Sequence, residues 1–236
     1  MKVLVTGGSG LLGTELKAQR SEWYYPARSI LDVTNFDKAK KEIVMHKPDK
    51  VLHCAALTSP PVCDQNKDAA IQVNKVGTEN LVKICSAYDI PLIYISTDYV
   101  FDGLKEGGMY KENDLPHPVN FYAVTKRLGE VAVENYPNGL IIRTSFCSKD
   151  KWPYPGAFID KFTSFDTVDV IAKEIIKAVR KDILGLIHIG TTRKSFYDLA
   201  KRLSPEVKEM SIQDVQFNVP PDTSLDSSKW RGLRVG

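Results

Sequence analysis

Short apolar runs alternate with longer amphipathic stretches along the chain. The runs have the length of strands and are hydrophobic almost without interruption, as in Leu92–Thr97. Such continuity is typical of strands buried on both faces, as in a parallel sheet covered by helices. The predicted strands are Lys2–Thr6, Trp23–Pro26, Val51–Ala56, Leu92–Thr97, Leu140–Thr144 and Leu186–Gly190. The predicted helices are Leu11–Arg20, Phe36–His46 (capped by Thr34 or Asn35), Asp68–Tyr88, Phe121–Tyr136, Val168–Lys181 and Phe196–Leu203. Strands that alternate with helices indicate an α/β fold with a doubly wound parallel sheet.

Two segments depart from this rhythm. Asp102–Pro118 is polar and glycine-containing and ends in Pro116-His117-Pro118, which predicts a long loop beside the carboxyl edge of the sheet. Residues 204–236 contain three prolines and show weak periodicity.

Composition excludes several classes of protein. The 236 residues are 43% hydrophobic and 26% charged, as in folded domains, and the net charge of +3 is too small to indicate a nucleic-acid partner. No apolar run approaches the roughly 18 residues that a membrane span requires. The N-terminus lacks the apolar core of a secretory leader, and the four cysteines contain no Cys-x-x-Cys pair. The four histidines have no acidic partner at ligand spacing. We therefore expect a cytoplasmic protein with reduced thiols and no metal site.

The first predicted strand runs into Gly7-Gly8-Ser9-Gly10-Leu11-Leu12-Gly13, which opens a predicted helix. A tight turn favours a residue that tolerates positive φ, and a pyrophosphate approaches closely where a Cβ is missing. The helix N-terminus adds free N–H groups and the positive end of its dipole. A glycine-rich turn without a ligand is the plain alternative, but a strand before the motif and a helix after it favour a dinucleotide site in a Rossmann fold. The candidate contacts are Gly7, Gly10, Leu11, Leu12 and Gly13.

The residues after the second predicted strand bear on the choice between NADH and NADPH. The segment from Tyr24 to Arg28 contains one base and no acid, which slightly favours NADPH, although Arg28 could equally be a solvated loop charge. Asp32, which precedes Val33, could accept from the adenine amino group or simply start a turn.

Tyr122 and Lys126 lie four residues apart at the start of a predicted helix, so they share one helical face. A nearby ammonium stabilises a phenolate, which predicts that the phenol exchanges a proton close to neutral pH. On an exposed helix the same spacing arises by chance. Here the pair follows a strand that ends in Ser96-Thr97, whose hydroxyls could bond a substrate oxygen or merely cap the strand.

Six motifs in a fixed order carry a resemblance to a known family. They are Gly7-x-x-Gly10-x-x-Gly13, His53-Cys54-Ala55-Ala56, Gln72–Thr78 around Asn74, Ser96–Gly103, Tyr122-x-x-x-Lys126 and Arg143-Thr144-Ser145. Together they resemble the extended short-chain dehydrogenase/reductase family, within it the dTDP-4-dehydrorhamnose reductase branch of sugar-nucleotide-binding enzymes. The resemblance covers residues 1 to about 146 well and the rest faintly.

The resemblance implies an NAD(P)H-dependent reductase of a 4-keto sugar nucleotide. Hydride comes from the nicotinamide and the proton from Tyr122, with Thr97 and Lys126 completing the catalytic trio and Lys126 also holding the nicotinamide ribose. It further implies that Asp98 and Tyr99 lie near the substrate. The implied cofactor-binding residues beyond those already named are Ala55, Ala56, Thr58 and Asn74, together with Tyr122 and Lys126. By analogy with the family, a homodimer is possible.

Departures from the family pattern leave alternatives open. Asp98 is followed by Tyr99 where related sugar dehydratases place a glutamate, which disfavours dehydration. The segment Ser59–Cys63 replaces an acidic stretch, and the late arginine-proline motif lacks its arginine. We expect residues 1–146 to form the dinucleotide-binding core, and residues 147–236 to complete the sheet and form a small, reduced substrate lobe. A non-catalytic dinucleotide-binding regulatory subunit and an NAD-dependent sugar-nucleotide epimerase remain alternatives.

Overall fold

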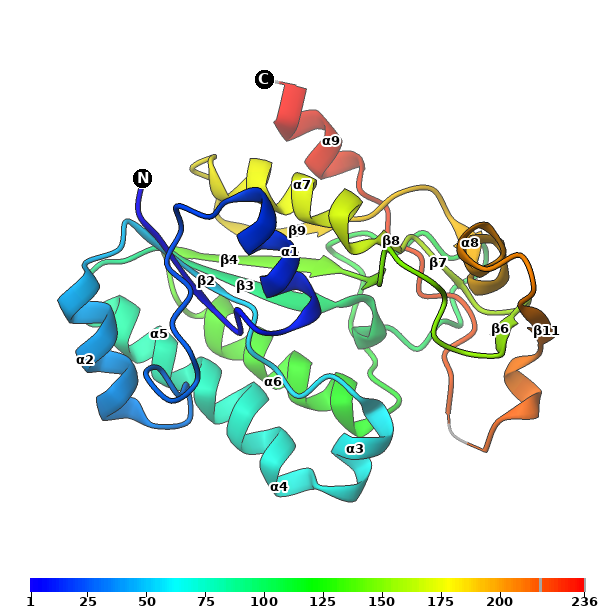
Figure 1. Ribbon diagram of the computed structural model, residues 1–236, viewed down its shortest axis with the longest axis horizontal. Coiled ribbons are helices and arrows are strands. Elements are labelled where there is room, and N and C mark those ends of the chain that lie inside the picture. The colour runs from blue at the N-terminus through cyan, green and yellow to red at the C-terminus, as the bar shows by residue number, and fades with distance from the viewer. Residues whose placement is uncertain (217, 236) are drawn as a thin grey trace.

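The fold is built on a central parallel sheet. The structure, a computed structural model, describes residues 1–216 and 218–235. The sheet has five strands in the order β1-β2-β3-β4-β9, all parallel. Their bounds are β1 Val3–Thr6, β2 Lys50–His53, β3 Leu92–Thr97, β4 Gly139–Thr144 and β9 Gly185–Ile189. Helices cover both faces of the sheet, which confirms the predicted doubly wound α/β class (Figure 1).

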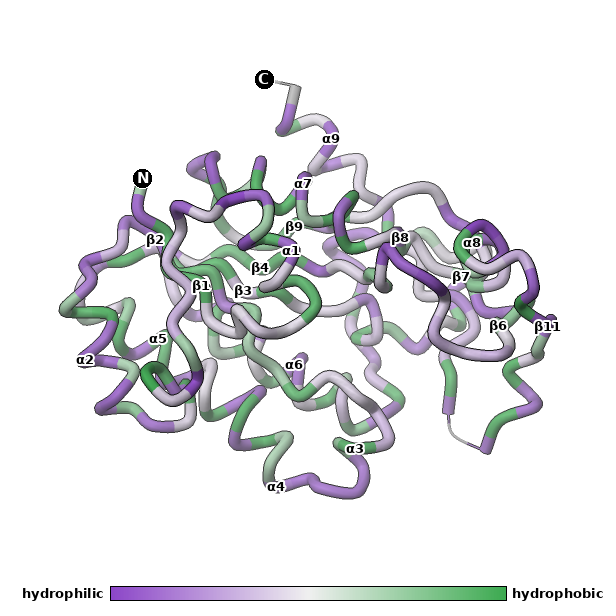
Figure 2. Tube along the Cα trace, viewed as in Figure 1, coloured by the Kyte–Doolittle hydropathy of each residue, from purple (hydrophilic) through white to green (hydrophobic). Residues whose placement is uncertain are grey.

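Alternate strand residues point to opposite faces, so each face builds its own core. One face packs against α1 (Leu11–Gln19) and α7 (Val168–Val179). The other packs against α2 (Phe36–His46), α5 (Gly77–Ala87) and α6 (Phe121–Glu134). Figure 2 shows the hydrophobic segments gathered along the strands, whereas the start of α4 (Lys67–Ala70) is hydrophilic.

The predicted strand at Trp23–Pro26 is wrong in extent. A single parallel bridge joins Tyr24 to Leu4 at the edge of the sheet. Tyr24 N donates to Val3 O at 2.9 Å, but Pro26 has no amide hydrogen with which to extend the ladder.

The predicted helix at Asp68–Tyr88 is interrupted. It divides into α4, a π-helical segment, η1 (Ile71–Val76), and α5. Such π-helical turns are rare and are often found at functional sites. Two further helices were not predicted: α3 (Pro60–Gln65), whose prolines occupy its first turn, and α9 (Ser228–Val235).

Apart from α7, β9 and α9 (Ser228–Val235), which lie on or in the central sheet, the elements after β4 form a small lobe beside the sheet, at the right in Figure 1. It has its own core, which includes Trp152, Phe165 and Leu199. Its elements are β5 Phe146–Cys147, β6 Gly156–Phe158, β7 Phe162–Thr163, β8 Asp166–Thr167, β10 Lys194–Ser195, α8 Phe196–Leu203, β11 Lys208–Met210 and η3 Ile212–Asp214. The strands pair as β5 with β8, β6 with β11, and β7 with β10.

The long segment 102–118 is a loop, as predicted. It begins after the 3₁₀ turn η2 (Asp98–Val100), and Tyr110 N donates to Ser224 O at 2.8 Å. The loop thereby joins the end of β3 to the last part of the chain. Across residues 1–216 and 218–235, every helix falls short of the length and hydrophobicity that crossing a membrane requires.

Candidate functional site

The glycine loop forms a cradle whose geometry requires glycine at two of its positions. Gly7 has φ +72°, and a Cβ there would lie 2.6 Å from Ala55 N. A Cβ on Gly13 would collide with the Gly7 carbonyl oxygen, so this glycine lets α1 pack on the loop. Gly10 is different, because a Cβ there would meet only Gly7 O, at 3.4 Å, and its open side faces a cavity. Gly10 therefore allows a ligand to approach the backbone closely.

A cavity of about 450 Å³ lies over this loop. Of the predicted cofactor contacts, it is lined by Gly7, Gly10, Arg28, Asp32, Val33, Ala55 and Ala56. It is also lined by residues that were not predicted as cofactor contacts: Gly8, Ser9, Lys17, Tyr25, Pro26, Ala27, Leu31, Cys54 and Val73. Lys17 lies in the last turn of α1, well beyond the glycine motif, so the motif gave no signal for it. The cavity therefore extends from the glycine loop past the carboxyl end of β2 to the segment Tyr25–Arg28.

The remaining predicted contacts lie elsewhere. Leu12 is buried in the core under α1, whereas Leu11 and Thr58 are exposed. Asn74, Tyr122 and Lys126 lie outside the lining of this cavity, toward the carboxyl end of β3.

Arg28 and Asp32 form a pair at the rim of the cavity. Arg28 Nε lies 3.4 Å from Asp32 Oδ2, and the arginine side chain is 77% exposed. Burial alone would raise the pKa of Asp32, but hydrogen bonds from Thr34 and the charge of Arg28 lower it below its ordinary value. The rim therefore carries an ionised carboxylate and an exposed cation.

Asn74 links the segment after β2 to α6 through hydrogen bonds of its side chain. Its side chain accepts from Leu57 N at 2.8 Å and donates to Leu57 O at 2.9 Å. It also donates to Thr125 Oγ1 at 2.9 Å, and Thr125 donates in turn to Tyr122 O at 2.7 Å. The π-helical segment thus fixes the first turn of α6, where Tyr122 lies.

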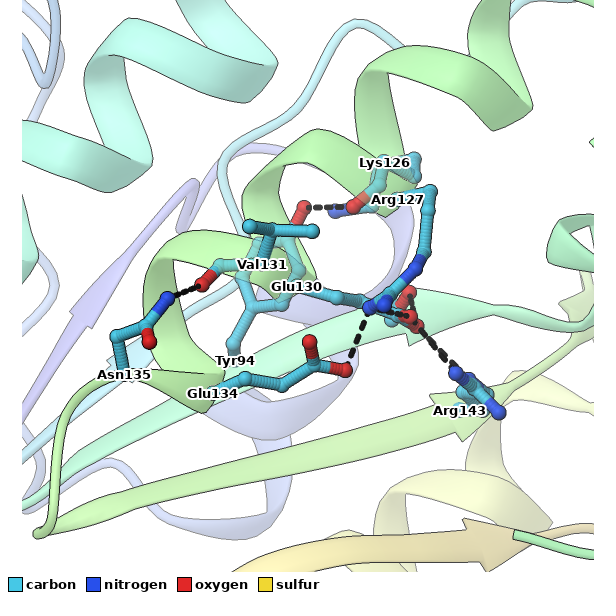
Figure 3. A network of polar contacts seen from close by, with 9 residues as sticks. Tyr94, Lys126, Arg127, Glu130, Val131, Glu134, Asn135 and Arg143 are labelled. Carbon is cyan, nitrogen blue, oxygen red and sulfur yellow. Dashed lines mark hydrogen bonds and ion pairs between the residues drawn. The ribbon is translucent and has the colours of Figure 1, made fainter. Parts of the chain in front are cut away.

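Lys126 is 3% exposed and lies over the end of β3. Its Nζ donates to Ile95 O at 2.8 Å and lies 4.0 Å from the centroid of the Tyr94 ring. Tyr94 Oη donates to Lys126 O at 3.3 Å, as Figure 3 shows. Burial lowers the pKa of Lys126 to about 7, against the opposing effects of Glu130 and Cys54.

Thr97 and Tyr122 meet at the carboxyl end of β3. Burial raises the pKa of Tyr122 well above its ordinary value, and a hydrogen bond with the Thr97 side chain acts in the other direction. The Lys126 ammonium donates to Ile95 O and makes no hydrogen bond to the Tyr122 phenol. The expectation of a phenol that titrates near neutral pH is therefore wrong for this structure.

A buried ion pair lies one helical turn along α6 from Lys126 (Figure 3). Arg143 on β4 donates from Nε and Nη2 to the two carboxylate oxygens of Glu130 at 2.9 and 2.8 Å. Ser96 Oγ adds a third donor at 2.6 Å. Glu130 was not predicted, although it follows Lys126 by four residues on the same helix. The pair joins α6 to β3 and β4.

Asp98 and Tyr99 take different positions. Asp98 is 1% exposed, and its Oδ2 accepts from Thr163 Oγ1 at 2.8 Å and from Thr223 Oγ1 at 2.7 Å. The carboxylate is thus turned into the small lobe rather than toward an open cleft. The ring of Tyr99 stands edge-on to that of Tyr122, with 6.4 Å between centroids.

The chain is similar in sequence to a protein family and to several known proteins. Residues 1–217 match the family model described as RmlD substrate binding domain. The chain is 32% identical over 226 residues to "dTDP-4-keto-6-deoxy-D-glucose reductase" of Streptomyces niveus, which covers 84% of this chain and 76% of that protein. It is 38% identical over 154 residues to "Methionine adenosyltransferase 2 subunit beta" of Rattus norvegicus, which covers 60% of this chain and 46% of that protein. The chain therefore spans about half the length of this second relative.

The fold is also similar to that of a solved reductase structure. The crystal structure of dTDP-4-dehydrorhamnose reductase from Bacillus anthracis in complex with NADP has a TM-score of 0.89 and 25% sequence identity. The match covers 98% of this chain and 92% of that one.

Proposed function

Because the chain belongs to the RmlD substrate binding domain family, we propose that it reduces the 4-keto group of a nucleotide sugar with NADPH. The observation that carries the proposal is the position of Thr97, Tyr122 and Lys126 at the carboxyl edge of a parallel sheet. The relatives named as reductases of dTDP-4-keto sugars support the substrate class.

The residues of the cavity fit a dinucleotide. Gly10 presents backbone without a Cβ at the start of α1, where N–H groups and the helix dipole favour a pyrophosphate. The NADP complex of the related reductase supports the same cofactor here. We assign Arg28 to a ribose 2′-phosphate and Asp32 to the adenine side of the cavity, with Ala55 and Ala56 along its wall.

The bound dinucleotide supplies a hydride, and this chain supplies the proton. Tyr122 is the acid that gives its phenolic proton to the ketone oxygen, and the Thr97 hydroxyl orients that oxygen and the phenol. Because burial raises the pKa of Tyr122, the phenol keeps its proton at neutral pH until a stronger base forms beside it. That base is the alkoxide which develops as hydride reaches the carbon.

The proposal extends to the organisation of the chain. Residues 1–146 bind the cofactor, and residues 147–236 complete the sheet and supply the substrate lobe. The partner is a small nucleotide sugar rather than a nucleic acid. A homodimer is part of the same proposal, and sedimentation of the purified protein tests it.

The test is consumption of NADPH with dTDP-4-dehydrorhamnose and related 4-keto nucleotide sugars. We expect loss of NADPH absorbance and a product that has gained two hydrogens by mass spectrometry. Silence across the panel would contradict the proposal. If the silent protein bound NADPH tightly and co-purified with another protein, it would instead be a regulatory subunit, as the name of the Rattus norvegicus relative suggests. Nicotinamide that survives purification and a 4-epimer as product would indicate an epimerase.

A further inference from the structure

One buried cation near the site is unused by the proposed reaction. Lys161, between β6 and β7, is 0% exposed. Its Nζ donates to Thr223 Oγ1 at 2.7 Å and lies 4.9 Å from the centroid of the Tyr99 ring and 5.8 Å from that of Phe196. Among the described residues no carboxylate pairs with it directly. Burying an ammonium without a counterion destabilises the folded protein, so some other group must balance the charge of Lys161.

The Thr223 hydroxyl links Lys161 to its counterion, Asp98. Thr223 accepts from Lys161 and donates its single proton to Asp98 Oδ2 at 2.7 Å. A hydroxyl has one proton to donate, so the ammonium and the carboxylate together fix the direction of this chain. Thr163 Oγ1 donates to the same carboxylate oxygen at 2.8 Å.

The same carboxylate touches the catalytic trio. Asp98 directly follows Thr97, and its Oδ1 lies 3.4 Å from Thr97 Oγ1. After burial itself, the negative charge of Asp98 is among the influences that raise the pKa of Tyr122. Transfer of the phenolic proton to a ketone leaves a phenolate at this position, and an unbalanced carboxylate beside it would oppose the transfer.

We propose that Lys161 is a positioning residue for the proton transfer. It acts through Thr223 to hold Asp98 in place and to balance its charge, and so lets Tyr122 become negative. The inference rests on the proposed function. In the step itself the Tyr122 O–H bond breaks, its proton forms the O–H bond of the product, and hydride forms the C–H bond. Lys161 transfers no proton.

Several groups surround Lys161 and enter the expected pH dependence. Asp98 and Asp222 favour its charged form, whereas burial lowers its pKa to about 8. Tyr99 faces it from η2, and Arg193 binds Asp222 through a 2.7 Å contact.

The test compares Lys161→Met with Lys50→Met. Lys50 is also buried, but at the far end of the sheet, where its Nζ donates to Val179 O and Lys181 O. We expect Lys161→Met to lower kcat for dTDP-4-dehydrorhamnose by at least about tenfold, with KM and the NADPH Kd within about threefold. Wild-type kcat should fall above about pH 8 as Lys161 loses its proton, and this fall should be absent from Lys161→Met, because the variant has no charge to lose. Lys50→Met should lower Tm and leave kcat and the profile unchanged.

A rescue and a second variant make the test decisive. Thr223→Val should reproduce the altered profile, and it replaces Lys161→Met if that variant fails to fold. Adding Asp98→Asn to Lys161→Met removes the unbalanced charge, so kcat should recover at least about fivefold across the pH range.

Two results would overturn the inference. One is a folded Lys161→Met variant with the parental kcat and profile, and the other is a lower kcat with an unmoved profile, which indicates a structural role alone. Tyr122→Phe in the same assay separates the two proposals. If wild type reduces the substrate and Tyr122→Phe does not, then a Lys161→Met variant with unchanged kcat and pH profile contradicts only this inference. If wild type is inactive, both the proposed function and this inference are wrong.

Discussion

Replacing Lys126 with methionine tests the electrostatics of the trio through protein stability. Burial lowers the pKa of this lysine from 10.5 to about 7. Below pH 7 both the folded and the unfolded chain hold the proton, so the folded protein bears the full cost of the buried charge. Between pH 7 and 10.5 the unfolded chain binds more protons, so the contribution of Lys126 to stability rises with pH. The lowered pKa corresponds to about 5 kcal/mol, and relaxation around a buried charge reduces this to an expected change of at least about 2 kcal/mol.

The assay is guanidinium unfolding of cofactor-free wild type and Lys126→Met at pH 6 and pH 10. The free energy of unfolding of wild type minus that of the variant should increase by at least about 2 kcal/mol between the two pH values. Lys173→Met, which removes an exposed lysine on α7, is the matched control for losing a lysine. A difference that stays flat or falls with pH would refute the burial of a charged Lys126.

Three further predictions concern stability and cofactor binding. Arg143→Met leaves Glu130 buried without its bidentate partner and should cost about 3 kcal/mol, seen as a Tm drop of roughly 6–12 °C by calorimetry; an unchanged Tm would contradict the ion-pair account. Gly13→Ala should weaken NADPH binding by at least about tenfold in calorimetric titration, whereas Gly232→Ala, where the added Cβ meets nothing within 4 Å, should not. Arg28→Ala should raise the Kd of NADPH about tenfold with little effect on NADH, and equal effects on the two cofactors would remove its 2′-phosphate role.

Buried strands and capped helices were predictable because their causes are local. The uninterrupted run Leu92–Thr97 predicts the bounds of β3, and they match. Helix α8 also begins and ends where predicted, since Ser195 and Asp198 form a capping box at its N-terminus. The glycine cradle likewise follows from its spacing, because steric limits around Gly7 and Gly13 are properties of the loop itself.

Features that depend on tertiary contacts were missed. The protonation of Tyr122 depends on burial by neighbouring elements, which spacing from Lys126 does not reveal. The role of Asp98 is set by Thr163 and Thr223, which lie 65 and 125 residues away in sequence. The interruption of the helix at Asn74 was also invisible to periodicity, since the π-helical turn shifts the register by a single residue.

The most direct test of the account is hydride transfer in a single turnover by Tyr122→Phe. The substitution removes the proposed acid and little else, so NADPH should bind within about threefold of the parental Kd while hydride transfer to dTDP-4-dehydrorhamnose slows by at least about 100-fold. Transfer at the parental rate would contradict Tyr122 as the source of the proton.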